Sequence, residues 1–282
     1  MGAGGGAPVA AKAGGAGQAD RCSVMLWALK GVAASFEDRL DLAAKAGFRC
    51  VELVDEFRSW SEAEWVAVLG RLRGLGLTVD AIAPLRLGFA DPAGGGAMLA
   101  ELESVLPALR RLGSPQIILV SGPRGAAAGE DGMAAQHAVA VETLRRVAGM
   151  LERERMVAVI EPIDRIENPP VYLDTVTEAF ALTRAVGSPH VKVLYDFFHE
   201  QRTHGNLIEK LEAGIAEVGL VHVADVPGRH QPGTGEVSYE NVYRTLRRLG
   251  YTGRVAMEFY PEGDAREVLG RARVEAERAL VG

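Results

Sequence analysis

From residue 21 onward, short apolar runs alternate with longer amphipathic stretches. The runs are rich in valine, isoleucine and leucine, which is typical of strands buried on both faces of a parallel sheet. The predicted strands are Cys22–Trp27, Cys50–Val54, Leu77–Pro84, Gln116–Ser121, Met156–Pro162, Val191–Phe197, Gly219–Asp225 and Arg254–Pro261. The predicted helices are Phe36–Ala46, Glu62–Leu75, Met98–Leu112, Ala134–Glu154, Thr175–Val186, Leu207–Val218, Tyr239–Leu249 and Ala265–Leu280.

The ends of several predicted helices carry recognisable signals. Ser35 and Ser61 precede their helices as N-cap residues. Three of the predicted helices end in a basic residue followed closely by glycine, at Gly47, Gly113 and Gly250. The cation suits the helix dipole, and glycine suits the left-handed position after the helix.

Eight strands alternate strictly with eight helices, and this pattern predicts a closed (β/α)8 barrel of the α/β class. A doubly wound sheet is the alternative. However, the first turn, Trp27–Gly31, lacks the G-x-G-x-x-G pattern of such sheets, and no phosphate-binding P-loop occurs in the sequence. We therefore expect two regions, a flexible Gly/Ala-rich tail over residues 1–20 and a single barrel domain over residues 21–282.

Composition and charge exclude several classes of protein. The net charge of −6 argues against a nucleic-acid-binding protein, and no apolar run reaches the roughly 18 residues of a membrane span. The two cysteines, Cys22 and Cys50, are expected to be buried thiols. The predicted location is the cytoplasm. A trimmed export signal before residue 20 remains the alternative, because Ala10–Ala13 resembles a small-residue cleavage site.

Four consecutive predicted strands carry a carboxylate or an imidazole at or near the carboxyl end. These residues are Glu161, Asp196, His222 and Glu258, separated by 35, 26 and 36 residues. Such gaps fit single βα units of roughly 30 residues, and barrel active sites lie at the carboxyl ends of the strands. We therefore expect the four side chains to meet on one side of the barrel mouth.

A single carboxylate at a strand end is often only a helix cap or an ion-pair partner, but four in succession predict a ligand cluster. Three carboxylates placed together repel one another, and a divalent cation would relieve that repulsion. Oxygen ligands with one nitrogen and no thiolate favour Mg²⁺ or Mn²⁺, while Co²⁺ or Zn²⁺ could also bind.

Other residues are expected near this cluster. His199 follows Asp196 by three positions and should point from the same loop toward the mouth. The run His199–His204 is one residue too long for the zinc-protease motif. Arg229, in the loop after strand 7, could bind a substrate carboxylate or could be an exposed loop charge. Trp27 could line the pocket or pack in the core.

At these residues the sequence resembles the hydroxypyruvate isomerases. The similar segments are Glu161–Ile163, Tyr195–Gln201, Val221–Glu236 and Met257–Pro261. The wider group is the xylose-isomerase-like barrel superfamily, which includes ketose 3-epimerases and 2-oxo-tetronate isomerases. The close similarity spans about Glu161 to Asp264, and one departure is Asp164, where the pattern has asparagine.

The resemblance implies roles for particular residues. Glu161 and Glu258 would be the catalytic acid/base pair, and Glu161, Asp196, His222 and Glu258 would bind the metal. His199, Glu167 and Arg229 would contact the substrate. The implied reaction is an isomerisation of a small 2-oxo acid or ketose through an enediolate, best represented by hydroxypyruvate going to 2-hydroxy-3-oxopropanoate (tartronate semialdehyde).

Three alternatives stay open at this point. A ketose 3-epimerase, or a 2-oxo-tetronate or other sugar isomerase, would use the same residues, and a non-catalytic sugar-binding barrel would use them without turnover. The expected partner is a small-molecule substrate, with no nucleic acid and no membrane. Barrels of this kind often form homo-oligomers, although no feature of the sequence indicates an interface.

Overall fold

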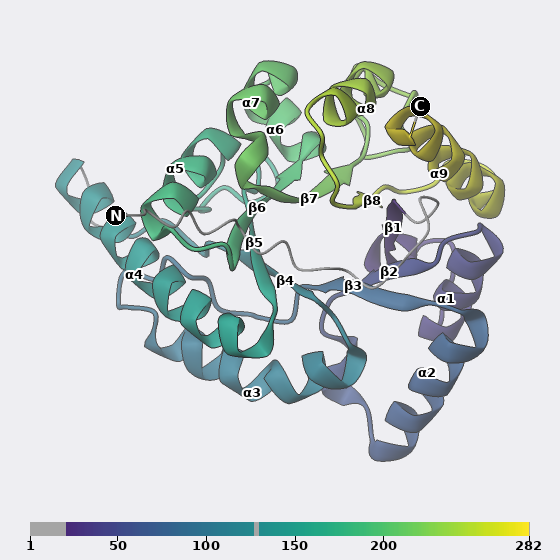
Figure 1. Cartoon of the computed structure of the whole chain (residues 1–282), viewed down its shortest axis with the longest axis horizontal. Coiled ribbons are helices and arrows are strands. Elements are labelled where there is room, and N and C mark those ends of the chain that lie inside the picture. Colours follow the sequence, from purple (N-terminus) through teal and green to yellow (C-terminus); the bar gives the residue numbers. More distant parts are fainter. Residues whose placement is uncertain (1–20, 127–129, 282) are drawn as a thin grey trace, which may run out of the picture.

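The computed structural model describes residues 21–126 and 130–281, and within them eight parallel strands close into a barrel. Each strand pairs with its neighbour in the sequence, and β8 returns to pair with β1 (Figure 1). The strands are β1 (Cys22–Met25), β2 (Cys50–Leu53), β3 (Thr78–Ile82), β4 (Gln116–Val120), β5 (Val157–Glu161), β6 (Val191–Asp196), β7 (Val218–Val223) and β8 (Val255–Met257). The predicted (β/α)8 barrel is confirmed, whereas the predicted tail over residues 1–20 lies outside the described residues.

The helices surround the ring of strands (Figure 1). They are α1 (Phe36–Lys45), α2 (Glu62–Leu75), α3 (Gly96–Leu112), α4 (Glu130–Glu154), α5 (Val176–Val186), α6 (Phe197–Thr203), α7 (Leu207–Gly214), α8 (Tyr239–Arg248) and α9 (Ala265–Val281). Short 3-10 helices span Leu26–Leu29, Glu56–Ser59 and Ile215–Glu217. Among the described residues, no helix has the length and apolar character needed to cross a membrane.

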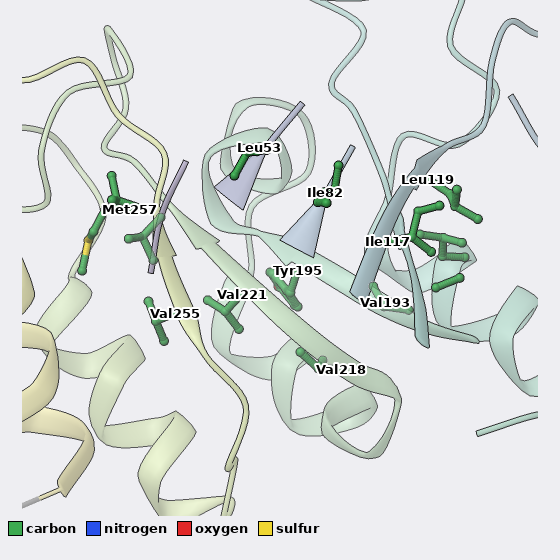
Figure 2. Packing of buried hydrophobic residues seen from close by; sticks show 14 of the residues in the cluster. Leu53, Ile82, Ile117, Leu119, Val193, Tyr195, Val218, Val221, Val255 and Met257 are labelled. Atoms are coloured by element: carbon green, nitrogen blue, oxygen red, sulfur yellow. The ribbon is translucent and has the colours of Figure 1, made fainter. Parts of the chain in front are cut away.

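Two apolar layers follow from the alternation of side chains along each strand. The larger layer packs strand residues against the helices, and Figure 2 shows Leu53, Val193, Val221 and others within it. The smaller layer fills the inside of the barrel and comes from Met25, Ala81, Ile118, Val159, Leu194 and Leu220. A side chain two positions after one of these interior residues points the same way and therefore lies beyond this smaller layer, at the barrel mouth.

The predicted helix signals are confirmed. The Ser35 and Ser61 side chains each accept a hydrogen bond from the third residue of their helix, which returns a carboxylate to the serine N–H. Gly47, Gly113 and Gly250 have positive φ values of 90°, 70° and 72°, which only glycine adopts readily. Cys22 and Cys50 are buried thiols, as predicted.

Several predicted boundaries were wrong at the carboxyl ends of strands. Strand β6 ends at Asp196 rather than Phe197, and helix α6 begins directly after it. The Asp196 side chain accepts a hydrogen bond from the Phe198 N–H and so caps this helix. His199 consequently lies in the first turn of α6, not in the loop that the sequence predicted. The chain also leaves β1, β3, β7 and β8 earlier than expected, because it turns there to form the mouth.

Candidate active site

The barrel mouth brings together the four side chains predicted from the strand ends. Each lies two positions after an interior apolar residue: Val159 precedes Glu161, Leu194 precedes Asp196, Leu220 precedes His222 and Ala256 precedes Glu258. All four are buried, and one ligand atom from each lies within 4.8 Å of the others. Asp196 and His222 are direct neighbours in the pairing of β6 with β7. The period-two geometry of parallel strands therefore builds the cluster.

The chemistry of this cluster fits a divalent cation. The Oδ2 atom of Asp196 is buried and accepts no hydrogen bond, although it lies 3.5 Å from His199 Nε2 and 3.6 Å from Arg229 Nη2. A buried carboxylate oxygen without a partner is costly unless another group satisfies it. A hard cation that accepts oxygen ligands together with one imidazole nitrogen would satisfy this atom and neutralise the surrounding acidic groups.

Glu258 is held by three donors. Trp27 Nε1 donates to its Oε1 at 2.7 Å, while Oε2 lies 2.8 Å from His222 Nδ1 and 2.9 Å from Arg229 Nη2. Burial opposes ionisation of this carboxyl, yet Arg229 and His222 hold its pKa well below the ordinary value. The Trp27 contact makes this ring part of the wall of the site, one of the two roles considered for it.

Glu161 experiences the opposite environment. Burial and the neighbouring charge of Glu258 raise its pKa to about 7. His199 Nε2 lies 3.8 Å from Glu161 Oε1, beyond hydrogen-bond distance. Two facing carboxyl groups with pKa values shifted apart are the usual arrangement for a general acid and a general base.

His199 is fixed by Asp164, which follows β5. Asp164 Oδ2 lies 2.6 Å from His199 Nδ1, and this contact turns the Nε2 atom toward Asp196 at 3.5 Å. Arg202 Nη1 also donates to Asp164, at 3.2 Å. The aspartate is itself held by the backbone N–H groups of Ile166 and Glu167. His199 therefore presents one oriented nitrogen to the cluster.

Arg229 is buried, so its alternative interpretation as an exposed loop charge was wrong. It is 4% exposed, and besides the contact with Glu258 its Nη1 donates to both carboxylate oxygens of Glu167, at 3.2 and 3.1 Å. Its guanidinium carbon lies 5.2 Å from the Trp27 ring centroid and 4.8 Å from that of Phe198. Arg229 adopts a left-handed backbone conformation with φ of 59°, which non-glycine residues rarely occupy.

A cavity of about 320 Å³ adjoins these groups. Glu167, Phe198, Arg202, Arg229 and Tyr260 help to line it. Its size is at the lower end of the range for small-molecule sites. A larger cavity of about 650 Å³ lies between α8 and α9, on the outside of the barrel.

Three residues near the site were not assigned a role from the sequence. Glu52 contacts His222, Asp164 orients His199, and Arg202 reaches Asp164 and Glu167. Glu52 had a detectable signal, because it is a lone carboxylate between Val51 and Leu53 in an otherwise apolar strand. Asp164 was noticed only as a departure from the family pattern, and Arg202 carried no signal.

A closed (β/α)8 barrel with a buried carboxylate–histidine cluster at the carboxyl ends of its strands has the architecture of a barrel enzyme. The model of one protein family, the xylose isomerase-like TIM barrel, matches residues 40–274. The chain belongs to this family.

Two similar proteins show which members of this family the chain resembles. A protein of Homo sapiens named "Putative hydroxypyruvate isomerase" is 35% identical over 245 residues, which cover 82% of this chain and 86% of that protein. A 2-oxo-tetronate isomerase of Cupriavidus necator is 29% identical over 247 residues, which cover 84% and 91%. The predicted resemblance to the hydroxypyruvate isomerases is thus confirmed, and the chain is similar to enzymes of the aldose–ketose isomerase class.

Among solved structures, an AP endonuclease of family 2 from Brucella melitensis superimposes with a TM-score of 0.77 at 24% identity. The alignment covers 89% of this chain and 96% of that one. At this identity the similarity concerns the fold alone.

Proposed function

We propose that this protein is an isomerase that converts hydroxypyruvate to 2-hydroxy-3-oxopropanoate. The observation that carries the proposal is the buried pair Glu161 and Glu258, which face each other at the barrel mouth in opposite electrostatic environments. An aldose–ketose isomerisation needs one group that removes a proton from carbon and one that returns a proton to the adjacent carbon. The similarity to hydroxypyruvate and 2-oxo-tetronate isomerases supports the same reaction class.

We further propose that Glu161, Asp196, His222 and Glu258 hold a divalent cation, with Mg²⁺ or Mn²⁺ preferred. When bound, such a cation supplies Lewis-acid polarisation of the substrate oxygens. The buried Asp196 oxygen that accepts no hydrogen bond and the three carboxylates within one cluster support this assignment.

The side chains would divide the proton transfers between them. Glu258, held ionised by its three donors, would remove a proton from C3, the carbon that carries the hydroxyl group. Glu161 would deliver a proton to C2, the former carbonyl carbon. The hydroxyl proton passes from O3 to O2, and His199, held by Asp164, would stabilise the charge that develops on these oxygens in the enediolate.

The guanidinium of Arg229 would bind the carboxylate that distinguishes a 2-oxo acid from a neutral ketose. In the structure Arg229 contacts the carboxylate of Glu167, and Arg202 Nη1 lies 3.5 Å from the same carboxylate. Glu167 is half-exposed, with 45% of its side chain accessible, so it could yield this position to a substrate carboxylate.

Proton exchange measured by NMR in D₂O tests the acid/base roles. Deuterium should enter the substrate carbon with the wild-type protein, while Glu161→Gln and Glu258→Gln should each lower turnover by at least about 100-fold, the usual contribution of a positioned acid or base. The exposed Glu103, on α3, offers a matched control, and Glu103→Gln should leave turnover unchanged. Full activity in both site variants would contradict the assignment.

A substrate panel separates hydroxypyruvate from the alternatives. Hydroxypyruvate, a 2-oxo-tetronate and neutral ketoses should be compared, each with chelator and then with added Mg²⁺ or Mn²⁺. A preference for the two carboxylated substrates fits the role given to Arg229. Turnover of neutral ketoses alone would instead indicate a 3-epimerase or sugar isomerase, and binding without turnover a non-catalytic barrel.

A further inference from the structure

Glu52 is a buried carboxylate inside the barrel that the proposed reaction does not use. It lies on β2, is 0% exposed and does not belong to the four-residue cluster at the mouth. Its Oε2 atom lies 2.9 Å from His222 Nε2, and its Oε1 atom accepts a hydrogen bond from Ser23 Oγ at 2.8 Å. Across the described residues, these are the hydrogen bonds that its side chain makes. Burying a carboxylate is costly unless its partners compensate, and His222 and Ser23 are the partners that do so here. The question is what the contact with His222 does for the site.

The two nitrogens of His222 face different groups. Nδ1 points toward Glu258 and the cluster, at 2.8 Å, whereas Nε2 points toward Glu52. An imidazole binds a metal only through a nitrogen without a proton, and the hydrogen bond at the other nitrogen decides which one that is. Without a metal, Nδ1 donates to the Glu258 carboxylate, and a metal ion that binds at Nδ1 would displace this proton. A carboxylate that keeps the proton on Nε2 then leaves the lone pair of Nδ1 for the metal. Ser23 fixes the carboxylate in turn, so the ring has a defined orientation before any ligand arrives.

We propose that Glu52 is a positioning residue, which holds His222 in its Nε2-protonated form and thereby sets the affinity of the mouth for a divalent cation. This inference rests on the proposed metal site. Partners of this kind on metal-binding histidines typically change metal affinity by about 10- to 100-fold. Glu52 acts through His222 and lies outside the cluster that would hold the metal.

The first measurement is the dissociation constant of Mn²⁺ for the purified full chain, obtained by electron paramagnetic resonance without any substrate. Glu52→Ala should weaken Mn²⁺ binding by about 10- to 100-fold. Glu52→Gln keeps an oxygen that can accept the Nε2 proton, so its loss should be smaller. Glu200 is the matched control, because it is another buried carboxylate, but its hydrogen-bond partners are Thr175, Val176 and Lys210 rather than His222. Glu200→Gln should leave the Mn²⁺ constant unchanged.

The second measurement reads the tautomer directly in the wild-type protein. In ¹H–¹⁵N spectra of the Mg²⁺-loaded chain, His222 should carry its proton on Nε2, and Glu52→Gln should shift that proton signal upfield. This arm remains decisive even if Glu52→Ala does not fold. A proton on Nδ1, or Mn²⁺ binding in folded Glu52→Ala equal to that of the wild type, would overturn the role of Glu52 while leaving the metal site intact. Absence of Mn²⁺ and Mg²⁺ binding in the wild type would overturn both the metal site and this inference.

Discussion

His199 shows how much one side chain depends on its neighbours. Burial opposes the charged imidazolium, but the charge of Asp196, the hydrogen bond that His199 donates to Asp164 and the charge of Glu161 together raise the pKa of His199 to about 9. The same hydrogen bond contributes to holding the pKa of Asp164 below its ordinary value, against the effect of burial. At neutral pH the pair is therefore an ion pair inside the barrel mouth, with His199 protonated and able to donate from Nε2.

This ion pair predicts a pH dependence for the metal-free protein. Because the folded-state pKa of His199 exceeds its unfolded value of about 6.5, its contribution to stability is complete below pH 6.5 and disappears as the pH rises through about 9. NMR titration should place the His199 midpoint near pH 9 and show a lower midpoint in Asp164→Asn.

Chemical denaturation provides the comparison for this residue. Between pH 6.5 and 9, the free energy of unfolding should fall more steeply in the wild type than in His199→Gln, since the variant lacks the titrating group. A His199 midpoint at or below 6.5 would show that burial, rather than the carboxylates, dominates this site.

At the scale of elements, the loop after β7 depends on Asp225. Its two carboxylate oxygens accept hydrogen bonds from the backbone N–H groups of Val226, Gly233, Thr234, Gly235 and Val237. Position 235 must be glycine, because the Cβ atom of any other residue would lie 2.0 Å from the Val226 carbonyl oxygen. Arg229 lies within this loop, so one buried aspartate positions the proposed substrate-binding guanidinium.

Replacing Asp225 should therefore affect stability and substrate binding together. Asp225→Ala should destabilise the fold by about 3 kcal/mol, because several backbone N–H groups lose a charged acceptor. It should also raise KM for a carboxylated substrate and speed hydrogen exchange at Gly233 and Gly235. Asp264, which caps the start of α9 at the Glu267 N–H, is the control, and its alanine variant should cost only about 1 kcal/mol and leave KM unchanged. Equal effects of the two variants would contradict the role of Asp225.

At the scale of the whole molecule, closure of the barrel makes the mouth a junction between distant segments. The cluster draws one residue from each of β5, β6 and β7 and one from the segment directly after β8, and Glu52 adds β2 through a contact across 170 residues of sequence. The cluster exists only in the folded barrel, so a ligand that binds it binds the native state and not the unfolded chain. Its binding energy therefore adds to the stability of the native state.

Thermal unfolding tests this coupling. Mn²⁺ at 100 times its dissociation constant should stabilise the folded chain by about 2.7 kcal/mol and raise Tm by several degrees. Chelator should reverse the shift, and Asp196→Asn should abolish it, since this variant replaces one oxygen of the proposed ligand by an amide nitrogen. A Tm that is the same with chelator and with Mn²⁺ would count against the metal site.

The sequence by itself determined the order of strands and helices and the four groups at the mouth. These features are local, because the apolar runs define the strands and Glu161, Asp196 and His222 each follow an interior residue by two positions. The sequence did not locate the helix that begins at Phe197, since the capping role of Asp196 competes with its position at a strand end.

Only the tertiary structure decided which groups contact one another. Glu52 meets His222, and Asp164 meets His199, because the closed barrel aligns strands that are far apart in the chain. The burial of Arg229 between Glu258, Glu167 and two aromatic rings likewise depends on how the loop after β7 folds over the mouth. Hydrogen-bond partners and pKa shifts are set by distances through space, and periodicity along the chain carries no information about those distances.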